Sequence, residues 1–168
     1  MMISEQMNSA LNKQVANELN TSFAYLAMAF ELDDMGLKIF GERFVQQSDE
    51  EREHAMKITG YLQDVGGKVV LSGVDTPRSE YGSARSMVEA ALESEKTVTR
   101  QINDLVSLAE SEKDYATRSF LQWYVDEQVE EVSSMSELLQ MVEMAGESNL
   151  FLVENRLAKM MKQEQGKE

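Results

Sequence analysis

The chain has 168 residues and a formal net charge of −14, with one histidine, one proline and no cysteine. This length suits a single domain with a sizeable core, and the scarcity of proline favours helices. The lack of cysteine excludes disulfides, thiolate metal sites and cysteine nucleophiles, and is typical of a reducing compartment. The acidic charge argues against nucleic acid as a partner and favours cations.

The sequence also lacks the marks of a membrane or exported protein. It has no uninterrupted run of about 18 apolar residues, the length that a transmembrane helix requires. Its first residues do not form a basic region followed by an apolar run, which a signal peptide would show. We therefore expect a soluble, cytoplasmic protein that does not bind membranes.

The hydrophobic pattern predicts four long helices followed by a short terminal one. Their expected ranges are residues 4–35, 38–65, 84–111, 114–145 and 149–162. Ser4 is a candidate N-cap of the first helix, and Ser86 with Glu89 forms a candidate capping box for the third. Glycines follow the first, second and fourth helices, as is common at helix ends. We predict an all-α chain with one domain spanning residues 1–168.

The segment between the second and third helices is irregular. Residues 66–83 contain the only proline, Pro77, and several glycines. At about 3.3 Å per residue, the segment could extend roughly 60 Å. A helix of about 28 residues is only about 42 Å long, so this connection is able to return along the whole bundle. We therefore predict a four-helix bundle with a long crossover, in which the second and third helices are parallel.

Each long helix has an expected core-facing stripe that carries carboxylate near its middle. In the first helix the stripe is Leu11, Val15, Glu18, Ser22, Tyr25 and Ala29, and in the second it is Phe40, Phe44, Gln47, Glu51, His54, Ile58, Tyr61 and Val65. In the third it is Val88, Leu92, Glu95, Thr99, Ile102, Val106 and Ala109, and in the fourth Phe120, Tyr124, Glu127, Glu131, Ser134, Leu138, Met141 and Ala145. The carboxylates are expected to lie at one level of the bundle.

These glutamates could be ordinary ion-paired or surface residues, but their stripes contain no lysine or arginine. Two like charges 4 Å apart repel by about 4 kcal/mol even at an effective dielectric of 20. Bound cations would remove that repulsion. Glu51 and His54 are three residues apart and share a helix face, so they are able to bind one ion together. Oxygen ligands with one imidazole suit iron, manganese or zinc, and Glu51 is placed to bridge two ions.

The same residues resemble the bacterial non-haem ferritins over nearly the whole chain. The resemblance is carried by Asn17-Glu18-Leu19-Asn20, by Glu50-Glu51-Arg52-Glu53-His54, by Glu95, and by residues 120–131 (FLQWYVDEQVEE). Ferritin-like di-iron bundles take a glutamate from each of two helices and Glu-x-x-His from each of the other two. Here Glu130 stands where the second histidine would be.

The resemblance implies a set of iron ligands. It gives the first iron to Glu18, Glu51 and His54, and the second to Glu51, Glu95 and Glu131. It gives a third iron to Glu50, Glu127, Glu130 and Glu131. Gln128 is implied to lie beside the iron pair, and Tyr25 to hydrogen-bond there and supply an electron. Trp123 is expected to be a packing residue.

The function implied by the resemblance is iron storage and detoxification. Fe(II) would be oxidised by O2 or H2O2, and the ferric product would be deposited inside a shell of 24 subunits. No haem is expected, because Arg52 occupies the place of the haem-binding methionine of bacterioferritins and arginine does not ligate haem iron. Animal ferritins have acidic pore residues early in the fourth helix, where this chain has Arg118 and Leu121. The alternatives are a di-iron oxidase or peroxidase that does not store iron, and a metal-free helical interaction module.

Overall fold

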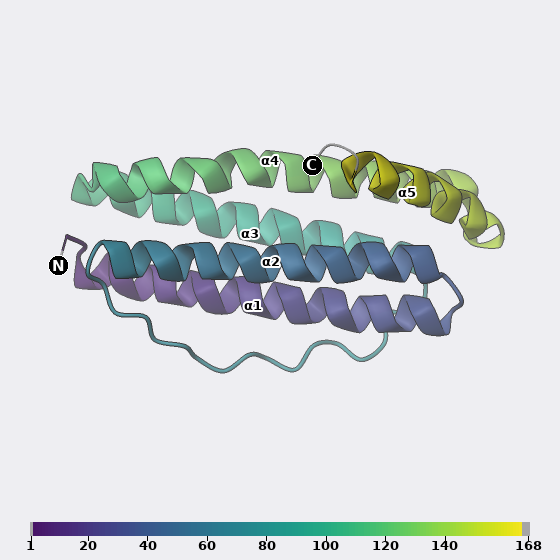
Figure 1. Cartoon of the computed structure of the whole chain (residues 1–168), viewed down its shortest axis with the longest axis horizontal. Helices are drawn as coiled ribbons and strands as arrows, with labels where there is room; N and C mark the ends of the chain where they lie inside the picture. Colours follow the sequence, from purple (N-terminus) through teal and green to yellow (C-terminus); the bar gives the residue numbers. More distant parts are fainter. Residues whose placement is uncertain (1, 166–168) are drawn as a thin grey trace.

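The structure, a computed structural model, describes residues 2–165 and is helical, without strands in that range. The helices are α1 (Glu5–Asp34), α2 (Lys38–Asp64), α3 (Ala84–Glu112), α4 (Tyr115–Ala145), a short 3-10 helix η1 (Glu147–Asn149) and α5 (Leu150–Gln165). Figure 1 shows α1 to α4 as an elongated bundle, with α5 near one of its ends. The predicted all-α class, with four long helices and a short fifth one, is confirmed.

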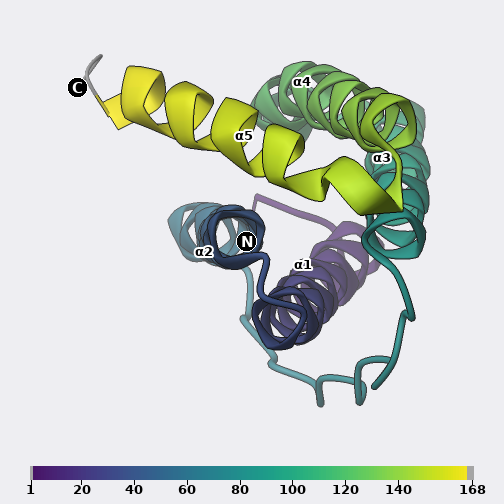
Figure 2. The same ribbon diagram turned by 90° about the vertical axis from the view of Figure 1, so that its right-hand side faces the viewer.

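The four long helices form two antiparallel pairs. Short turns join α1 to α2 and α3 to α4, and these two pairs have the most extensive contacts in the bundle. The crossover returns along α1, so α2 and α3 run in the same direction, as predicted (Figure 1). Viewed along the bundle, α5 lies over the space between α2 and α4 (Figure 2), and it packs against both. None of the described helices combines the length and apolar character needed to cross a membrane.

Side chains of α1 hold the crossover in place. Three asparagines and one glutamate accept hydrogen bonds from its backbone N–H groups. The pairs are Lys68 to Asn8 at 2.8 Å, Val70 to Asn12 at 2.7 Å, Asp75 to Asn20 at 2.8 Å and Tyr81 to Glu31 at 2.9 Å. An extended segment without a strand partner leaves its backbone donors unsatisfied, and these side chains take the place of that partner.

The helix starts follow local capping chemistry. The Oγ of Ser4 accepts from the Met7 N–H at 2.9 Å, so the predicted N-cap of α1 is confirmed. The predicted capping box at Ser86 is wrong. Ser83 is the N-cap of α3, and its Oγ accepts from the Ser86 N–H at 3.1 Å. Gly82, with φ of +86°, turns the chain just before this cap, so α3 starts three residues earlier than Ser86 would require.

The core consists of two apolar clusters with a polar layer between them. One cluster includes Leu11, Ile58 and Ile102, and the other includes Phe44 and Val88. The layer between them is made of buried polar side chains from all four long helices. They are Glu18, Ser22, Gln47, Ser48, Glu51, His54, Glu95, Gln128 and Glu131. The predicted carboxylate level of the bundle is therefore this layer.

The predicted core stripes of α1, α2 and α3 are buried or half-buried, whereas that of α4 is partly wrong. Leu121, Gln128, Met135 and Val142 are buried, one residue after each of the predicted Phe120, Glu127, Ser134 and Met141. Ser134 is exposed. The reason is that α4 packs against α3 as well as facing α2, so its buried face is rotated toward α3. The predicted stripe follows the carboxylates of α4, which lie on the side that faces α2.

Candidate metal centre

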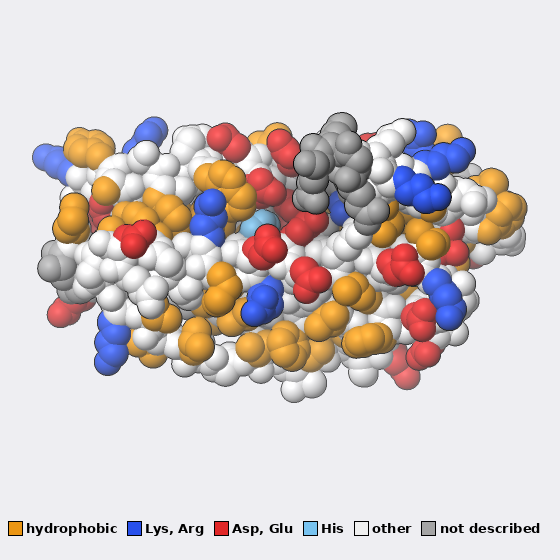
Figure 3. All heavy atoms as spheres, viewed as in Figure 1, with side chains coloured by type: hydrophobic (Ala, Val, Ile, Leu, Met, Phe, Trp, Pro, Cys, Tyr) orange, Lys and Arg blue, Asp and Glu red, His pale blue; other side chains and the backbone are white. Residues whose placement is uncertain are grey.

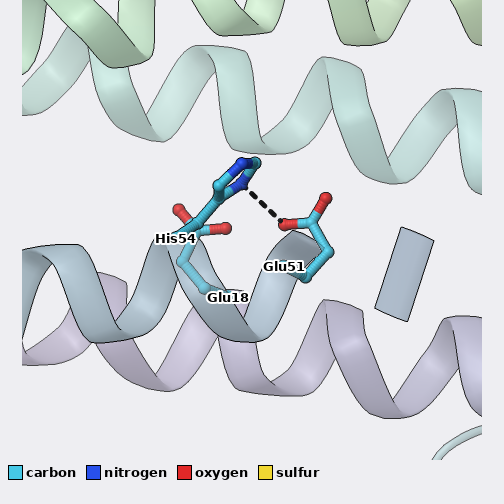
Figure 4. A group of neighbouring side chains, drawn as sticks. All are labelled: Glu18, Glu51 and His54. Atoms are coloured by element: carbon cyan, nitrogen blue, oxygen red, sulfur yellow. Dashed lines mark ion pairs between the residues drawn. The ribbon is translucent and has the colours of Figure 1, made fainter. Parts of the chain in front are cut away.

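Three of the predicted ligands meet on the α1 and α2 side of the polar layer. Glu18, Glu51 and His54 each offer a ligand atom, and these atoms all lie within 4.8 Å of one another. Figure 4 shows Glu18 from α1 pointing toward Glu51 and His54 of α2. His54 Nδ1 is 3.4 Å from Glu51 Oε2. The three-residue spacing within α2 places both groups on the face that meets α1.

A second group lies on the α4 side. His54, Glu127 and Glu131 also have ligand atoms within 4.8 Å of one another, with His54 Nε2 4.0 Å from Glu127 Oε1. The single imidazole therefore faces carboxylates on two sides, one nitrogen toward each. The sequence alone places His54 with only the first of these groups.

Glu95 belongs to neither group of described residues, although it was predicted to share an iron with Glu51 and Glu131. Its carboxylate is held on both oxygens: Tyr25 Oη donates to Oε1 at 2.5 Å, and Gln128 Nε2 is 3.4 Å from Oε2. Gln128 also donates to the Glu95 backbone carbonyl at 3.1 Å. These hydrogen bonds hold the Glu95 side chain toward α1 and α4.

The other predicted third-site residues lie further out. Glu127 is half-buried, Glu130 is exposed, and the Glu50 side chain keeps 43% of its exposure and pairs with Arg43 at 3.8 Å. The structure brings Glu127 and Glu131 to His54, but Glu50 and Glu130 are in neither ligand group of the described residues. Of the four residues predicted for the third site, only Glu131 lies in the polar layer.

Three glutamines support the carboxylates. Gln14 Nε2 donates to Glu18 Oε1 at 2.9 Å, and Gln47 Nε2 donates to Glu131 Oε2 at 2.6 Å. With Gln128 beside Glu95, each of the three outer glutamates has its own amide donor. Of these three glutamines, the sequence predicts a role in the site for Gln128 alone, and Gln47 is predicted only to face the core. A signal existed for Gln14, because residues four apart on a helix are neighbours and Gln14 precedes Glu18 by four.

Glu51 differs from the other three glutamates. Both of its oxygens are buried and accept no hydrogen bond, although Oε2 is 3.4 Å from His54 Nδ1, and Glu18 Oε2 also accepts none. Buried polar atoms without hydrogen bonds are rare in folded proteins, and carboxylate oxygens of this kind suit an ion. Glu51 belongs to the ligand group with Glu18 and His54, and its charge also interacts with those of Glu95 and Glu131. The residues present therefore fit a cation at each of the two ligand groups.

Burial disfavours the ionised form of these clustered carboxylates. Desolvation, followed by the charges of Glu95 and Glu131, raises the pKa of Glu51 well above its usual value. Desolvation and then Glu51 do the same to the pKa of Glu18. The pKa of Glu131 rises to about 7, mainly from burial. Since a bound cation favours the ionised carboxylates, cations and protons compete for this layer.

Aromatic side chains enclose the centre. Tyr25 is fully buried, and burial, with Glu95 next, raises the pKa of its phenol well above normal, so the phenol stays protonated as a donor. Tyr124 Oη donates to the His54 carbonyl at 2.7 Å. The Trp123 ring lies edge-on to His54 with centroids 5.4 Å apart, and Lys57 Nζ is 4.1 Å from the Trp123 centroid. Trp123 thus packs against the imidazole, in line with its predicted role.

The imidazole reaches the molecular surface between α2 and α4. Figure 3 shows the histidine in a groove there, with acidic side chains on one side of it and a basic and several hydrophobic side chains on the other. The acidic side of this groove, which we call the acidic groove, suits the approach of a cation to the centre.

Comparison with known proteins agrees with this arrangement. Residues 8–145 match the ferritin-like domain of the Ferritin family. The chain belongs to this family. The bacterial non-heme ferritin of Staphylococcus saprophyticus is 36% identical over 159 residues, which are 94% of this chain and 95% of that protein. Ferritin BfrB of Mycobacterium tuberculosis is 35% identical over 154 residues, or 92% and 84% of the two chains.

Solved ferritin structures have the same fold. An open-pore ferritin from the hyperthermophilic archaeon Archaeoglobus fulgidus superposes with a TM-score of 0.90 and is 41% identical, covering 92% of this chain and 97% of its own. The resemblance to bacterial non-haem ferritins is therefore confirmed, and the function of this ferritin is iron storage.

Proposed function

We propose that this ferritin is a ferroxidase, with Fe(II) as its substrate and the polar layer as its active centre. The first iron would be held by Glu18, Glu51 and His54, and the second by Glu51, Glu95 and Glu131. The observation that carries this proposal is the pair of buried, unpartnered oxygens of Glu51, one available to each iron. For Glu95 to reach the second iron, its side chain would give up its hydrogen bond to Tyr25 or Gln128.

The chemistry is a two-electron transfer. Two Fe(II) each lose one electron, and dioxygen takes both electrons with two protons, which gives two Fe(III) and hydrogen peroxide. If peroxide is the oxidant, its O–O bond breaks and it takes two electrons and two protons to give two waters. The protein contributes proximity, because two one-electron donors held side by side make the two-electron step accessible.

The side chains around the pair have separate roles. Gln14, Gln47 and Gln128 hold the outer carboxylates in position without adding positive charge that would repel iron. Tyr25 donates to Glu95 beside the pair. Its phenol would supply an electron only together with a third Fe(II), in which case dioxygen takes four electrons and four protons to give two waters. We place a third iron on the surface side, where Glu127 and Glu131 adjoin His54 and where Glu50 and Glu130 lie nearer to solvent.

The assembly is also a proposal. We expect the whole chain, α5 included, to form one ferritin-like domain, 24 copies of which make a hollow shell in the cytoplasm. Large apolar side chains remain exposed on the single chain, among them Phe23, Phe30 and Leu71. Extensive exposed apolar surface of this kind supports association with other copies. We expect no haem, since Arg52 is an exposed arginine at the position that a haem-ligating methionine would need.

The test is aerobic loading of the purified protein with Fe(II), followed by size-exclusion chromatography and iron assay of the eluted particle. A very large particle that carries more iron per chain than its carboxylates can bind directly, formed with rapid consumption of oxygen, is the expected result. A small particle whose iron saturates at two per chain would indicate a di-iron oxidase or peroxidase instead. If the protein bound no iron, it would be a metal-free helical interaction module instead.

A further inference from the structure

Besides the acidic groove, a cavity adjoins the centre on the side of α3. This open cavity of about 460 Å³ lies between α3 and α4. It is lined by four apolar residues and four uncharged polar ones, which are Ile102, Val125, Val129 and Val132, and Thr99, Asn103, Gln128 and Ser133. None of the described side chains that line it carries a charge. An uncharged cavity beside a carboxylate cluster is unusual in a chain with a net charge of −14.

Gln128 and Thr99 connect this cavity to the centre on the side of Glu95. Gln128 lines the cavity and is 3% exposed, and its Nε2 is 3.1 Å from the Glu95 carbonyl and 3.4 Å from the Glu95 carboxylate. Thr99, also in the lining, is 3.3 Å from the same Nε2. The cavity and the carboxylate layer therefore meet at the amide of Gln128.

The two approaches to the centre differ in chemistry. On the α2 side of α4, His54 and Glu127 border an acidic groove that attracts cations. On the α3 side of α4, valines and an isoleucine border a cavity that offers a cation no charged ligand. Apolar side chains make favourable contacts with small apolar species and offer no ligand to an ion. Dioxygen is a small apolar molecule, whereas Fe(II) and hydrogen peroxide are polar.

We infer that the cavity between α3 and α4 is the access site for dioxygen, which passes Gln128 to reach the iron pair while Fe(II) uses the acidic groove. This inference rests on the proposed ferroxidase function. No new redox step is involved, since the oxygen that arrives here takes the two electrons and two protons already described. Separate access lets oxygen reach the pair without competing with iron for the acidic groove.

The test is to fill the cavity and vary the oxidant. Val125 is half-buried at the cavity wall, and Val125→Phe places a larger apolar side chain there. Stopped-flow oxidation of a small Fe(II) addition is followed as the oxygen concentration is varied, and then with hydrogen peroxide under anaerobic conditions. We expect the rate at limiting oxygen to fall severalfold, with the rate at saturating oxygen and the peroxide rate unchanged. Val125→Ala is expected to leave oxygen access at least as fast as in the parent.

Controls keep the outcomes distinct. Val129 is 68% exposed, so Val129→Phe fills the mouth of the cavity and serves if Val125→Phe does not fold. Val45→Phe makes the same change on α2, away from the cavity, and is expected to have no effect. An oxygen dependence that both cavity variants leave unchanged overturns the inference, as does an equal loss with oxygen and peroxide, which would place the damage at the centre itself. If the parent protein oxidised no Fe(II) with either oxidant, the ferroxidase proposal would fail first.

Discussion

In the proposed centre Glu51 is the one ligand shared by both irons, and neither of its oxygens accepts a hydrogen bond. Glu51→Ala is therefore expected to abolish the rapid oxidation of the first two Fe(II) per chain while the metal-free bundle stays folded, since the change removes a buried carboxyl group whose ionisation the fold disfavours. The measurement is stopped-flow absorbance after mixing with aerated Fe(II), together with circular dichroism of the metal-free protein. Glu53→Ala, at an exposed position of α2, is the matched control.

Glu130 gives the contrast. Its side chain is exposed and lies outside both ligand groups of the described residues. Glu130→Ala should leave the first fast phase in place and change the response to later iron additions, when iron must leave the pair. If Glu130→Ala removed the first phase as completely as Glu51→Ala, Glu130 would have to be moved into the primary pair.

The raised carboxyl pKa values predict how the metal-free protein responds to pH. In the folded state Glu131 titrates at about 7, against 4.5 for an ordinary glutamate, and Glu18 and Glu51 are shifted in the same direction. The folded state thus holds protons that the unfolded chain has lost, so stability falls as pH rises from the unfolded value through the folded one. The melting temperature should be higher at about pH 5.5 than at about pH 8.

Two comparisons check this pH dependence. Glu131→Gln removes one of the shifted groups, so its melting temperature should fall less between the two pH values. Adding a divalent cation should raise the melting temperature more at the higher pH, where protons compete less for the carboxylates. A metal-free protein that grew more stable as pH rose over this range would show that these carboxylates are ionised and otherwise compensated.

Much of this residue-scale arrangement could be predicted from the sequence, because helical spacing determines which side chains share a face. Glu18, Glu51, His54 and Glu95 stand in otherwise apolar stripes, and all four are buried. The orientation of Glu95 could not be predicted in the same way. It depends on hydrogen bonds between helices, such as Tyr25 to Glu95 across 70 positions of sequence, and the pattern of one helix does not contain that information.

At the scale of the elements, α5 is fixed to the bundle by a contact with the start of α2. The N-cap of α2 is Leu37, which has no side-chain acceptor, and the Phe40 N–H donates instead to Glu154 Oε1 of α5 at 3.0 Å. A carboxylate at a helix N-terminus also interacts favourably with the helix dipole. Glu154 therefore acts as a cap supplied by another helix.

Removal of this cap is expected to loosen α5. Glu154→Ala should destabilise the protein by about 1 kcal/mol, the usual value of a helix cap. Thermal unfolding would measure the loss, and limited proteolysis would show whether α5 is cut sooner. Glu147→Ala, at an exposed position just before α5, is the control and should change neither. Equal behaviour of the two variants would mean that apolar packing alone holds α5.

The element boundaries show what local sequence determines. Ser4 and the glycines after α1, α2 and α4 mark helix ends because capping depends on near neighbours. The rotation of α4 by one residue depends instead on its packing against α3, which no pattern within α4 reveals. The length of the crossover and its proline predict an extended connection. The role of the α1 asparagines that bind it could not be predicted, because their hydrogen bonds join segments far apart in the sequence.

At the scale of the whole molecule, charge and apolar surface are divided between faces. The acidic groove around His54 lies between α2 and α4, whereas the neutral cavity lies between α3 and α4. Large apolar side chains such as Phe23 and Phe30 lie on α1. An assembled shell would bury apolar surface of this kind and leave the acidic groove as the part of the chain suited to iron. If the proposals for assembly, iron entry and oxygen access hold, each of them uses a different surface of the chain.

This division bears on the route by which iron reaches the centre. Of the two residues that correspond to the acidic pore positions of animal ferritins, Leu121 is fully buried and so cannot line a pore, whereas Arg118 is exposed. Arg118 Nε is 2.9 Å from Glu110 Oε1, which partly offsets its charge, and the two side chains offer no cation site. A pore bordered by this arginine would repel Fe(II) rather than collect it.

Arg118→Gln is therefore expected to change the initial rate of Fe(II) oxidation only modestly, because iron does not depend on that position. The rate is measured on the assembled protein at low and high ionic strength, since charge effects weaken with salt. Glu127→Gln, at the half-buried edge of the acidic groove, is the comparison and should slow oxidation much more. A collapse of the rate in Arg118→Gln would place the main iron route at the start of α4. A large increase would show that iron already passes there against the charge of the arginine.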